Sequence, residues 1–198
     1  MVMEIELKAH VGNYQALKVL LSQKAKYLGA FEKEDTYWFQ GKASTLPPSG
    51  LRVRREKRGL PDGTEKSSTI VTYKNRERRD GIEVNDEHEF EVKPGPEFEG
   101  FLKLMGLKPE ISKRKQGWAY SWEGICAELV KVDGLGWFVE LEIIADGIHA
   151  DGIYSADRQE EVIMQSKDRL LDFLAGLGIA KEAIESRYYT AMLQELVE

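Results

Sequence analysis

The chain has 198 residues, of which 42% are hydrophobic and 31% charged, and its formal net charge is −6. That length allows one domain with a sizeable core over residues 1–198. The negative charge argues against nucleic-acid binding. No apolar run approaches the roughly 18 residues of a membrane helix and no signal-peptide pattern opens the chain, so we expect a cytoplasmic protein without membrane contact. The single cysteine, Cys126, excludes an intrachain disulfide and a cysteine metal cluster.

In the first half of the chain, apolar and polar residues alternate along several short stretches, which predicts strands. Asn13 can cap a helix whose leucines recur at helical spacing, and Gly29 is expected to end it. Residues 75–86 are polar and basic, and we expect them to form a connection. The strands predicted here cover residues 2–11, 36–39, 51–56, 68–74 and 87–93.

The second half predicts a short helix opened by Pro94 and closed by Gly106. Three strands at 111–122, 125–132 and 137–144 follow, and then helices at 155–176 and about 181–196. About eight strands with mostly hairpin-length links indicate an α+β fold, with an antiparallel barrel or a strongly curled sheet and helices packed outside. The apolar strand faces would lie under the helices, so the charged faces would point into the barrel.

Six stretches carry such a charged face. In the first, Glu4, Glu6 and Lys8 share one side of a strand while Ile5 and Leu7 share the other. A solvated face explains any single row, but it fits less well when the opposite faces already account for helix packing. The rows are Glu4/Glu6/Lys8, Arg52/Arg54/Glu56, Thr72/Lys74, Glu87/Glu89/Glu91/Lys93, Lys113/Lys115 and Glu140/Glu142.

A lumen with both signs of charge has a definite chemistry. Carboxylate rows bind hard divalent cations through oxygen, and Lys and Arg rows bind phosphate. Isolated buried charges are unfavourable by several kcal/mol each, which favours a lumen that binds a ligand. The combination predicts a site for a metal–polyphosphate, most simply Mg²⁺ or Mn²⁺ with a triphosphate.

At this point the motifs resemble those of the CYTH superfamily, also called triphosphate tunnel metalloenzymes. That group contains class IV adenylyl cyclases, thiamine triphosphatases and inorganic tripolyphosphatases. The resemblance covers about the first three quarters of the chain, in the family's order, and is greatest to class IV adenylyl cyclases. Its motifs are Glu4-x-Glu6-x-Lys8, Asp35-Thr36-Tyr37, Leu51-Arg52-Val53-Arg54, Thr72-Tyr73-Lys74, Glu89-Phe90-Glu91, Lys113-x-Lys115 and Gly134-Leu135-Gly136-x-Phe138-Val139-Glu140-Leu141-Glu142.

The resemblance implies a closed eight-stranded antiparallel β-barrel and assigns roles to its lumen residues. It places Mg²⁺ or Mn²⁺ on Glu4, Glu6, Glu140 and Glu142. It places the triphosphate on Lys8, Arg52, Arg54, Lys74, Lys113 and Lys115. Catalysis would rest on Glu4, Glu6, Lys8 and Glu142, with Glu89, Glu91, Glu128 and Arg78 as further candidates.

Two departures from the family pattern stand out. Lys115 occupies a position where the family usually has Arg, and we favour it over Arg114 because a one-residue shift would turn the whole strand over. Val130 occupies a position where the family often has Asp. Glu128 shares the face of Val130 and is the better replacement, whereas Asp133 has the opposite parity. One or two metals therefore stay open.

Three functions fit these residues: a class IV adenylyl cyclase-like enzyme making cyclic AMP and pyrophosphate from ATP, a hydrolase of tripolyphosphate or thiamine triphosphate, and a non-catalytic nucleotide or polyphosphate sensor. The partner is a small triphosphate in each case, and a homodimer is common in the resembled family. Residues 40–50, 57–68 and 75–86 are expected to shape the tunnel mouth and to decide the reaction. Arg76, Arg78 and Arg79 are either a solvated basic loop or a lid over the phosphates.

Overall fold

A computed structural model describes residues 2–39, 50–79, 81–145 and 156–196. Eight antiparallel strands close into a barrel in the order β1-β5-β4-β3-β2-β6-β7-β8, which confirms the predicted α+β barrel. The strands are β1 (Val2–His10), β2 (Lys26–Phe39), β3 (Gly50–Gly59), β4 (Glu65–Arg79), β5 (Ile82–Glu91), β6 (Lys108–Trp122), β7 (Ile125–Val132) and β8 (Gly136–Ala145). The helices are α1 (Tyr14–Lys24), α2 (Gly95–Leu104), α3 (Ala156–Gly176) and α4 (Tyr189–Glu195), with a 3₁₀ turn, η1, at Lys181–Ala183. No described helix has the length and hydropathy to span a bilayer.

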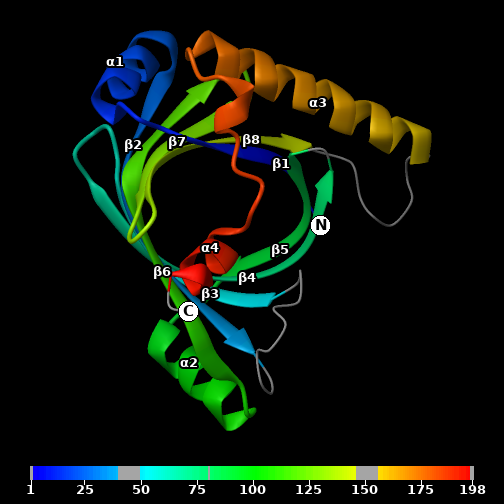
Figure 1. Cartoon of the computed structure of the whole chain (residues 1–198). Helices are drawn as coiled ribbons and strands as arrows, with labels where there is room; N and C mark the ends of the chain where they lie inside the picture. The colour runs from blue at the N-terminus through cyan, green and yellow to red at the C-terminus, as the bar shows by residue number, and fades with distance from the viewer. Residues whose placement is uncertain (1, 40–49, 80, 146–155, 197–198) are drawn as a thin grey trace.

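The largest apolar cluster lies outside the barrel wall, beneath α1 and α3 (Figure 1). Ile5 and Leu7 point outward from β1 and are 0% and 1% exposed. They share this cluster with Leu21 of α1 and Leu170 of α3. Burying each such side chain stabilises the fold by about 2 kcal/mol, so the pattern of alternation fixes which face of β1 turns inward.

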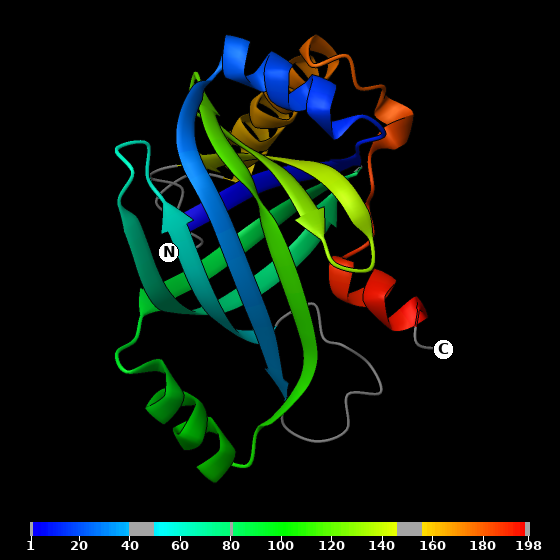
Figure 2. The same cartoon turned by 90° about the vertical axis from the view of Figure 1, so that its left-hand side faces the viewer.

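A second helix covers the opposite side of the barrel. In Figure 2, α2 projects below the strands, away from α1 and α3. Its Leu102 packs against Trp38, Val53 and Val71, which are the outward side chains of β2, β3 and β4. Helices therefore hold the apolar faces of strands on both sides, and the charged faces are left to the lumen.

Strand β2 is much longer than the predicted 36–39, because α1 ends at Lys24 and the chain becomes extended at once. Leu28 therefore lies in a strand and not in the helix. Gly29 does not cap a helix; its φ is +131°, and a Cβ there would lie 2.0 Å from the carbonyl oxygen of Gly59. The glycine thus permits the close approach of β2 to the end of β3.

The prediction of a connection at 75–86 is wrong. Strand β4 runs to Arg79 and β5 begins at Ile82, so only residues 80–81 link them. Gly81 has a φ of +86°, which suits a tight reversal. The hairpin adds Glu83 and Asn85 to the face of β5 that carries Glu87.

The predicted helix at 181–196 is also shorter in the structure. Residues 184–188 are not helical: Ile184 bridges Ala9, and the backbone N–H of Glu185 donates to the Lys8 carbonyl at 2.9 Å. Only α4 follows, and it does not pack outside. It lies across one end of the barrel (Figure 1), with Tyr189 and Thr190 lining the lumen.

Candidate functional site

The lumen of the barrel holds a cavity of about 310 Å³. Its wall is mostly charged, as the alternation of the strands predicts. The lining residues that the sequence placed in charged rows or named as candidates are Glu4, Glu6, Lys8, Arg52, Arg54, Glu56, Lys74, Glu87, Glu89, Lys113, Lys115, Glu128, Glu140 and Glu142. The others are Lys33, Tyr37, Arg58, Ile70, Glu83, Cys126, Ile144, Tyr188, Tyr189 and Thr190.

Three of the four predicted metal ligands converge. One carboxylate oxygen from each of Glu4, Glu6 and Glu142 lies within 4.8 Å of the other two. Register explains this, because Glu6 of β1 stands directly opposite Glu142 of β8. We call these residues the acidic trio. Three hard oxygen donors at this separation fit a divalent cation of the Mg²⁺ or Mn²⁺ type.

The carboxylates of the trio repel one another. Burial and a hydrogen bond with Glu87 raise the pKa of Glu4 to about 9. Burial and the charge of Glu6 raise the pKa of Glu142 to about 7. Burial would also raise the pKa of Glu6, but the charges of Lys74, Lys8 and Lys115 together hold that pKa below its ordinary value. Burial and the neighbouring carboxylates therefore disfavour ionisation of Glu4 and Glu142.

Lys74 is the cation nearest the trio. Its Nζ lies 2.8 Å from Glu4, 3.5 Å from Glu6 and 2.9 Å from Glu87. Burial alone would lower its pKa, yet the charges of Glu6 and Glu4 raise it above the ordinary value. Lys74 thus joins the acidic trio to the basic part of the lumen.

The fourth predicted metal ligand lies outside the trio. Both carboxylate oxygens of Glu140 are 2.7 Å from Lys115 Nζ. Although burial opposes it, the charge of Lys115 lowers the pKa of Glu140 to about 2. Glu140 is therefore the neutralising partner of a lysine in this arrangement.

The remaining cations are also paired within the wall. Arg54 donates two hydrogen bonds to Asp35, at 2.7 and 3.0 Å, and Lys113 lies 3.2 Å from the same carboxylate. Arg52 donates to Thr72 at 2.8 Å and to Glu87 at 3.1 Å. In a further pair of the same kind, Lys8 donates to Glu83 at 2.7 Å.

Tyr189 of α4 stands among three of the predicted phosphate-binding lysines. The Nζ atoms of Lys8, Lys113 and Lys115 lie 5.3, 5.2 and 5.2 Å from its ring centroid. Cation–π attraction stabilises this arrangement. Behind Tyr189, an apolar cluster that includes Val130, Phe138 and Met192 fills the same end of the lumen.

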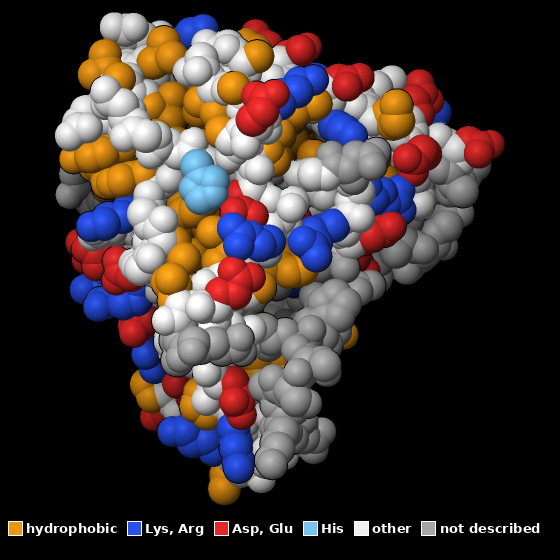
Figure 3. Space-filling model, viewed as in Figure 1, with side chains coloured by type: hydrophobic (Ala, Val, Ile, Leu, Met, Phe, Trp, Pro, Cys, Tyr) orange, Lys and Arg blue, Asp and Glu red, His pale blue; other side chains and the backbone are white. Residues whose placement is uncertain are grey.

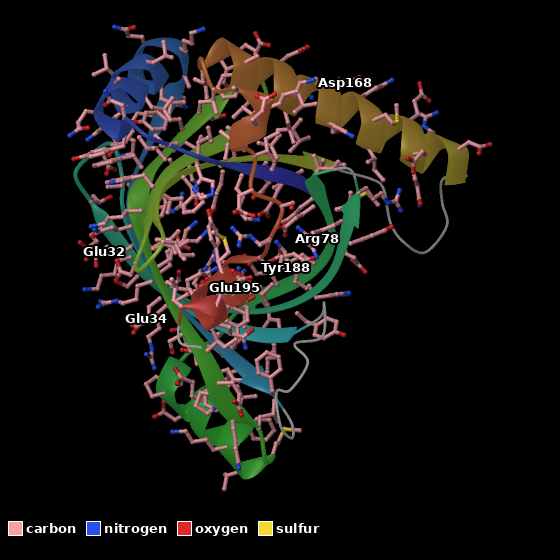
Figure 4. All side chains as sticks on the ribbon, in the orientation of Figure 1. Glu32, Glu34, Arg78, Asp168, Tyr188 and Glu195 are labelled. Carbon is pink, nitrogen blue, oxygen red and sulfur yellow. The ribbon has the colours of Figure 1, made fainter. Side chains whose placement is uncertain are left out.

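Two predicted candidates lie outside the cavity. Glu91 is exposed and pairs with Lys93 at 2.9 Å. Arg78 donates to the Ser186 carbonyl at 2.8 Å and stacks over the ring of Tyr188, so it holds the segment that leads to α4 (Figure 4). Neither contact touches the phosphate-binding cations. On the face that Figure 3 shows, side chains of both signs lie close together over this end of the barrel. The side chain of Arg76 and residues 40–49 lie outside the described part of the chain.

The structure shows where the residues that depart from the family pattern lie. Val130 is fully buried in the apolar cluster. Glu128 lies in the lumen but pairs with Lys33, at 2.6 and 2.8 Å, and Asp133 is exposed. Lys115 faces the lumen and Arg114 is exposed, as strand parity predicts. The described residues therefore bring together one carboxylate cluster of metal-binding size.

Among the charged and amide side chains of the lumen, the sequence reasoning missed Lys33, Arg58, Glu83 and Asn85. Asn85 lies opposite Glu4, is 0% exposed, and neither of its amide atoms has a hydrogen-bond partner among the described residues. The signal for Glu83 and Asn85 was the continuation of the Glu87 row at a spacing of two. Lys33 gave no such signal, because the outward neighbours Glu32 and Glu34 are charged as well (Figure 4).

Neither a protein-family model nor a curated protein matches the sequence. Solved structures do share its fold. The PH1819 protein from Pyrococcus horikoshii is 22% identical with a TM-score of 0.76, covering 97% of this chain and 99% of its own. A candidate adenylate cyclase from Vibrio parahaemolyticus is 18% identical with a TM-score of 0.76, covering 97% and 98%.

A candidate adenylyl cyclase from Hippeastrum, for which a dominant triphosphatase activity is described, is 19% identical with a TM-score of 0.64, covering 98% and 96%. At these identities the likeness establishes the fold. The barrel is thus shared with proteins named as adenylyl cyclases, in agreement with the resemblance to the CYTH superfamily that the motifs indicate.

Proposed function

We propose that this chain is an enzyme of the CYTH superfamily that binds a triphosphate and a divalent metal in the barrel lumen. One observation carries the proposal: the acidic trio and the six Lys and Arg side chains predicted to bind phosphate line the same cavity. The neighbours named as cyclases, one with a described triphosphatase activity, support the reaction class. Lys, Arg and Glu side chains that served only to face solvent would not be expected to line the interior of a closed barrel together.

One group of residues would bind the metal and another would bind the phosphates. Glu4, Glu6 and Glu142 would hold Mg²⁺ or Mn²⁺, which would neutralise phosphoryl charge and lower the pKa of the nucleophile. Arg52, Lys8 and Lys115 would exchange their present carboxylate partners for phosphate oxygens, while Arg54 and Lys113 would stay beside Asp35 and bind phosphate with their remaining N–H groups. Arg52 offers a planar fork for bidentate contacts. Lys74, between the two groups, would bridge metal-bound and distal phosphates.

The position of the trio favours a cyclase-type reaction on an organic triphosphate. Tyr189 and the apolar cluster fill the end of the lumen beyond Lys8, Lys113 and Lys115. The free end of a phosphate chain would therefore lie at these lysines, and the substituted α-phosphate at the trio. Attack there by a ribose 3′-hydroxyl forms a new P–O bond, breaks the bond to the β-phosphate and releases pyrophosphate. Hydrolysis of inorganic tripolyphosphate is the second candidate, since either of its ends could reach the trio.

Product analysis tests the proposal. The protein is incubated with ATP or tripolyphosphate and Mg²⁺ or Mn²⁺. We expect cyclic AMP and pyrophosphate from ATP. Orthophosphate release would establish the hydrolase, tight binding without turnover would establish a sensor, and no binding of either compound would overturn the triphosphate site.

A further inference from the structure

Asn85 of β5 lies beside the acidic trio. It stands directly opposite Glu4 in the register of β1 and β5, and cross-strand neighbours of this kind hold their Cβ atoms about 5 Å apart. Its side chain points into the lumen, because it has the parity of Glu83 and Glu87, which line the cavity. Glu142 of β8 therefore lies on one side of β1, and Asn85 lies on the other.

The amide of Asn85 is buried and unpaired. The residue is 0% exposed, and neither Nδ2 nor Oδ1 has a hydrogen-bond partner among the described residues. A buried amide without partners destabilises the fold, and native proteins keep few such groups. An apolar side chain of similar size would avoid the loss of stability, so the amide indicates a polar group that a bound ligand supplies.

Two lysines hold the carboxylates that surround this amide. Lys8 Nζ lies 2.7 Å from Glu83. Lys74 Nζ lies 2.8 Å from Glu4 and 2.9 Å from Glu87. The amide separates the two paired glutamates of β5, so it lies between the two ammonium groups, both of which would bind phosphate in the proposed function. When a phosphate takes Lys8 from Glu83, the same exchange would bring a phosphate oxygen within reach of the amide.

We propose that Asn85 is a further substrate-binding residue, whose amide N–H donates to an oxygen of the phosphate held at the acidic trio. This rests on the proposed function, because the trio must place a metal-bound phosphate beside Glu4. The surrounding carboxylates repel phosphate, and an uncharged donor adds attraction there without adding a cation that would compete with the metal. Because a hydrogen bond is directional, the amide would also orient that phosphate. The alternative is that the amide oxygen is a metal ligand.

Calorimetric titrations of the full chain distinguish these two roles. The probes are Ca²⁺ alone, a hard cation that takes the same oxygen ligands, and ATP or tripolyphosphate in the presence of Ca²⁺. Asn85→Val should lower the affinity for the triphosphate about tenfold and change the affinity for Ca²⁺ alone less than about twofold. Asn85→Asp has nearly the same shape but replaces the donor with a charged acceptor. It should lower the triphosphate affinity at least about tenfold while strengthening the binding of Ca²⁺ alone.

Gln116→Val is the matched control, because it removes an exposed amide from the outer face of β6. Its affinities should equal those of the wild-type protein. Asn85→Asp keeps the test decisive if Asn85→Val fails to fold. Unchanged triphosphate affinity in Asn85→Val would overturn the role of Asn85 while the triphosphate site stands. Triphosphate affinity of wild-type strength in Asn85→Asp would also overturn it and would assign the amide oxygen to the metal. If the wild-type protein binds neither ATP nor tripolyphosphate, the proposed function fails as well.

Discussion

Two carboxylate sites in the same lumen differ in how fully their charges are matched. At Asp35, one buried carboxylate accepts from Arg54 and lies beside Lys113. Burial would raise the pKa of Asp35, but Arg54 and Lys113 hold it well below its usual range. In the acidic trio, three carboxylates lie within 4.8 Å of one another, and Lys74 is the cation beside them.

This contrast distinguishes a carboxylate that stabilises the fold, Asp35, from the carboxylates of the trio, which would serve the reaction. The Asp35 cluster is electrostatically complete without a ligand, as expected of a group that holds β2, β3 and β6 together. The negative charge of the trio is balanced only when a further cation binds. Removing a carboxylate should therefore damage the fold at the first site and the chemistry at the second.

The largest effect is expected from Glu142→Gln. The variant keeps the shape of the side chain and removes one charge from the trio, so metal-dependent turnover should fall at least about 1,000-fold, or about 4 kcal/mol in activation free energy. Folding should survive, because a repelling charge has been lost. Steady-state rates with Mg²⁺ and urea unfolding measure the two quantities.

Glu91→Gln is the matched control, since this exposed glutamate pairs with Lys93 outside the cavity. Its turnover should equal that of the wild-type protein. Glu6→Ala should repeat the effect of Glu142→Gln. Undiminished activity in either trio variant would remove the metal assignment.

Asp35→Asn should act on stability. It leaves Arg54 and Lys113 in the lumen without their anion, which should lower the free energy of unfolding by about 3 kcal/mol. Glu34→Gln, one residue away on the outer face (Figure 4), removes a partly exposed carboxylate and should change stability by less than about 0.5 kcal/mol. Denaturant titrations at pH 7 compare them, and equal stabilities would show that the Asp35 cluster is not a structural unit.

The pH dependence of that difference sharpens the comparison. The folded-state pKa of Asp35 is depressed, so its contribution is fully present above the unfolded-state value of about 3.9. It is lost as the pH falls toward the folded-state pKa. The stability gap between wild type and Asp35→Asn should therefore be constant from pH 7 to 5 and shrink below about pH 4. A gap that widens on acidification would contradict the assigned sign.

Part of the barrel could be predicted from alternation, because β1, the first half of β3 and the middle of β8 place apolar side chains on one face and charged ones on the other. Strand β2 could not, since Glu32 and Glu34 face outward while Lys33 and Asp35 face inward. Charge on both faces removes the hydrophobic period that marks a strand. The polar and basic residues 75–86 of the β4–β5 hairpin lacked a clear hydrophobic period for a similar reason, so they were not predicted as strands.

Which lumen charges meet could not be predicted either. Parity placed Glu140 and Glu142 on one face, yet only Glu142 joins Glu4 and Glu6. The register of β8 against β1 and the reach of Lys115 decide this, and both depend on strands far apart in the sequence. Spacing predicts a face, whereas pairing is a property of the closed barrel.

The smallest effect should come from Asn85, which lies next to the acidic trio, opposite Glu4. Its amide atoms are buried opposite Glu4 without a hydrogen-bond partner in the described chain. Asn85→Val should therefore raise the free energy of unfolding by about 1–2 kcal/mol. Thr72→Val is the matched contrast, because the buried Thr72 hydroxyl accepts from Arg52 and donates to Glu89. That variant should lose about 1 kcal/mol. Thermal unfolding of both variants without ligand measures these changes. A gain in stability in Asn85→Val would show that the unpaired amide of Asn85 destabilises the fold. A loss of stability in that variant would show that the amide already has hydrogen-bond partners.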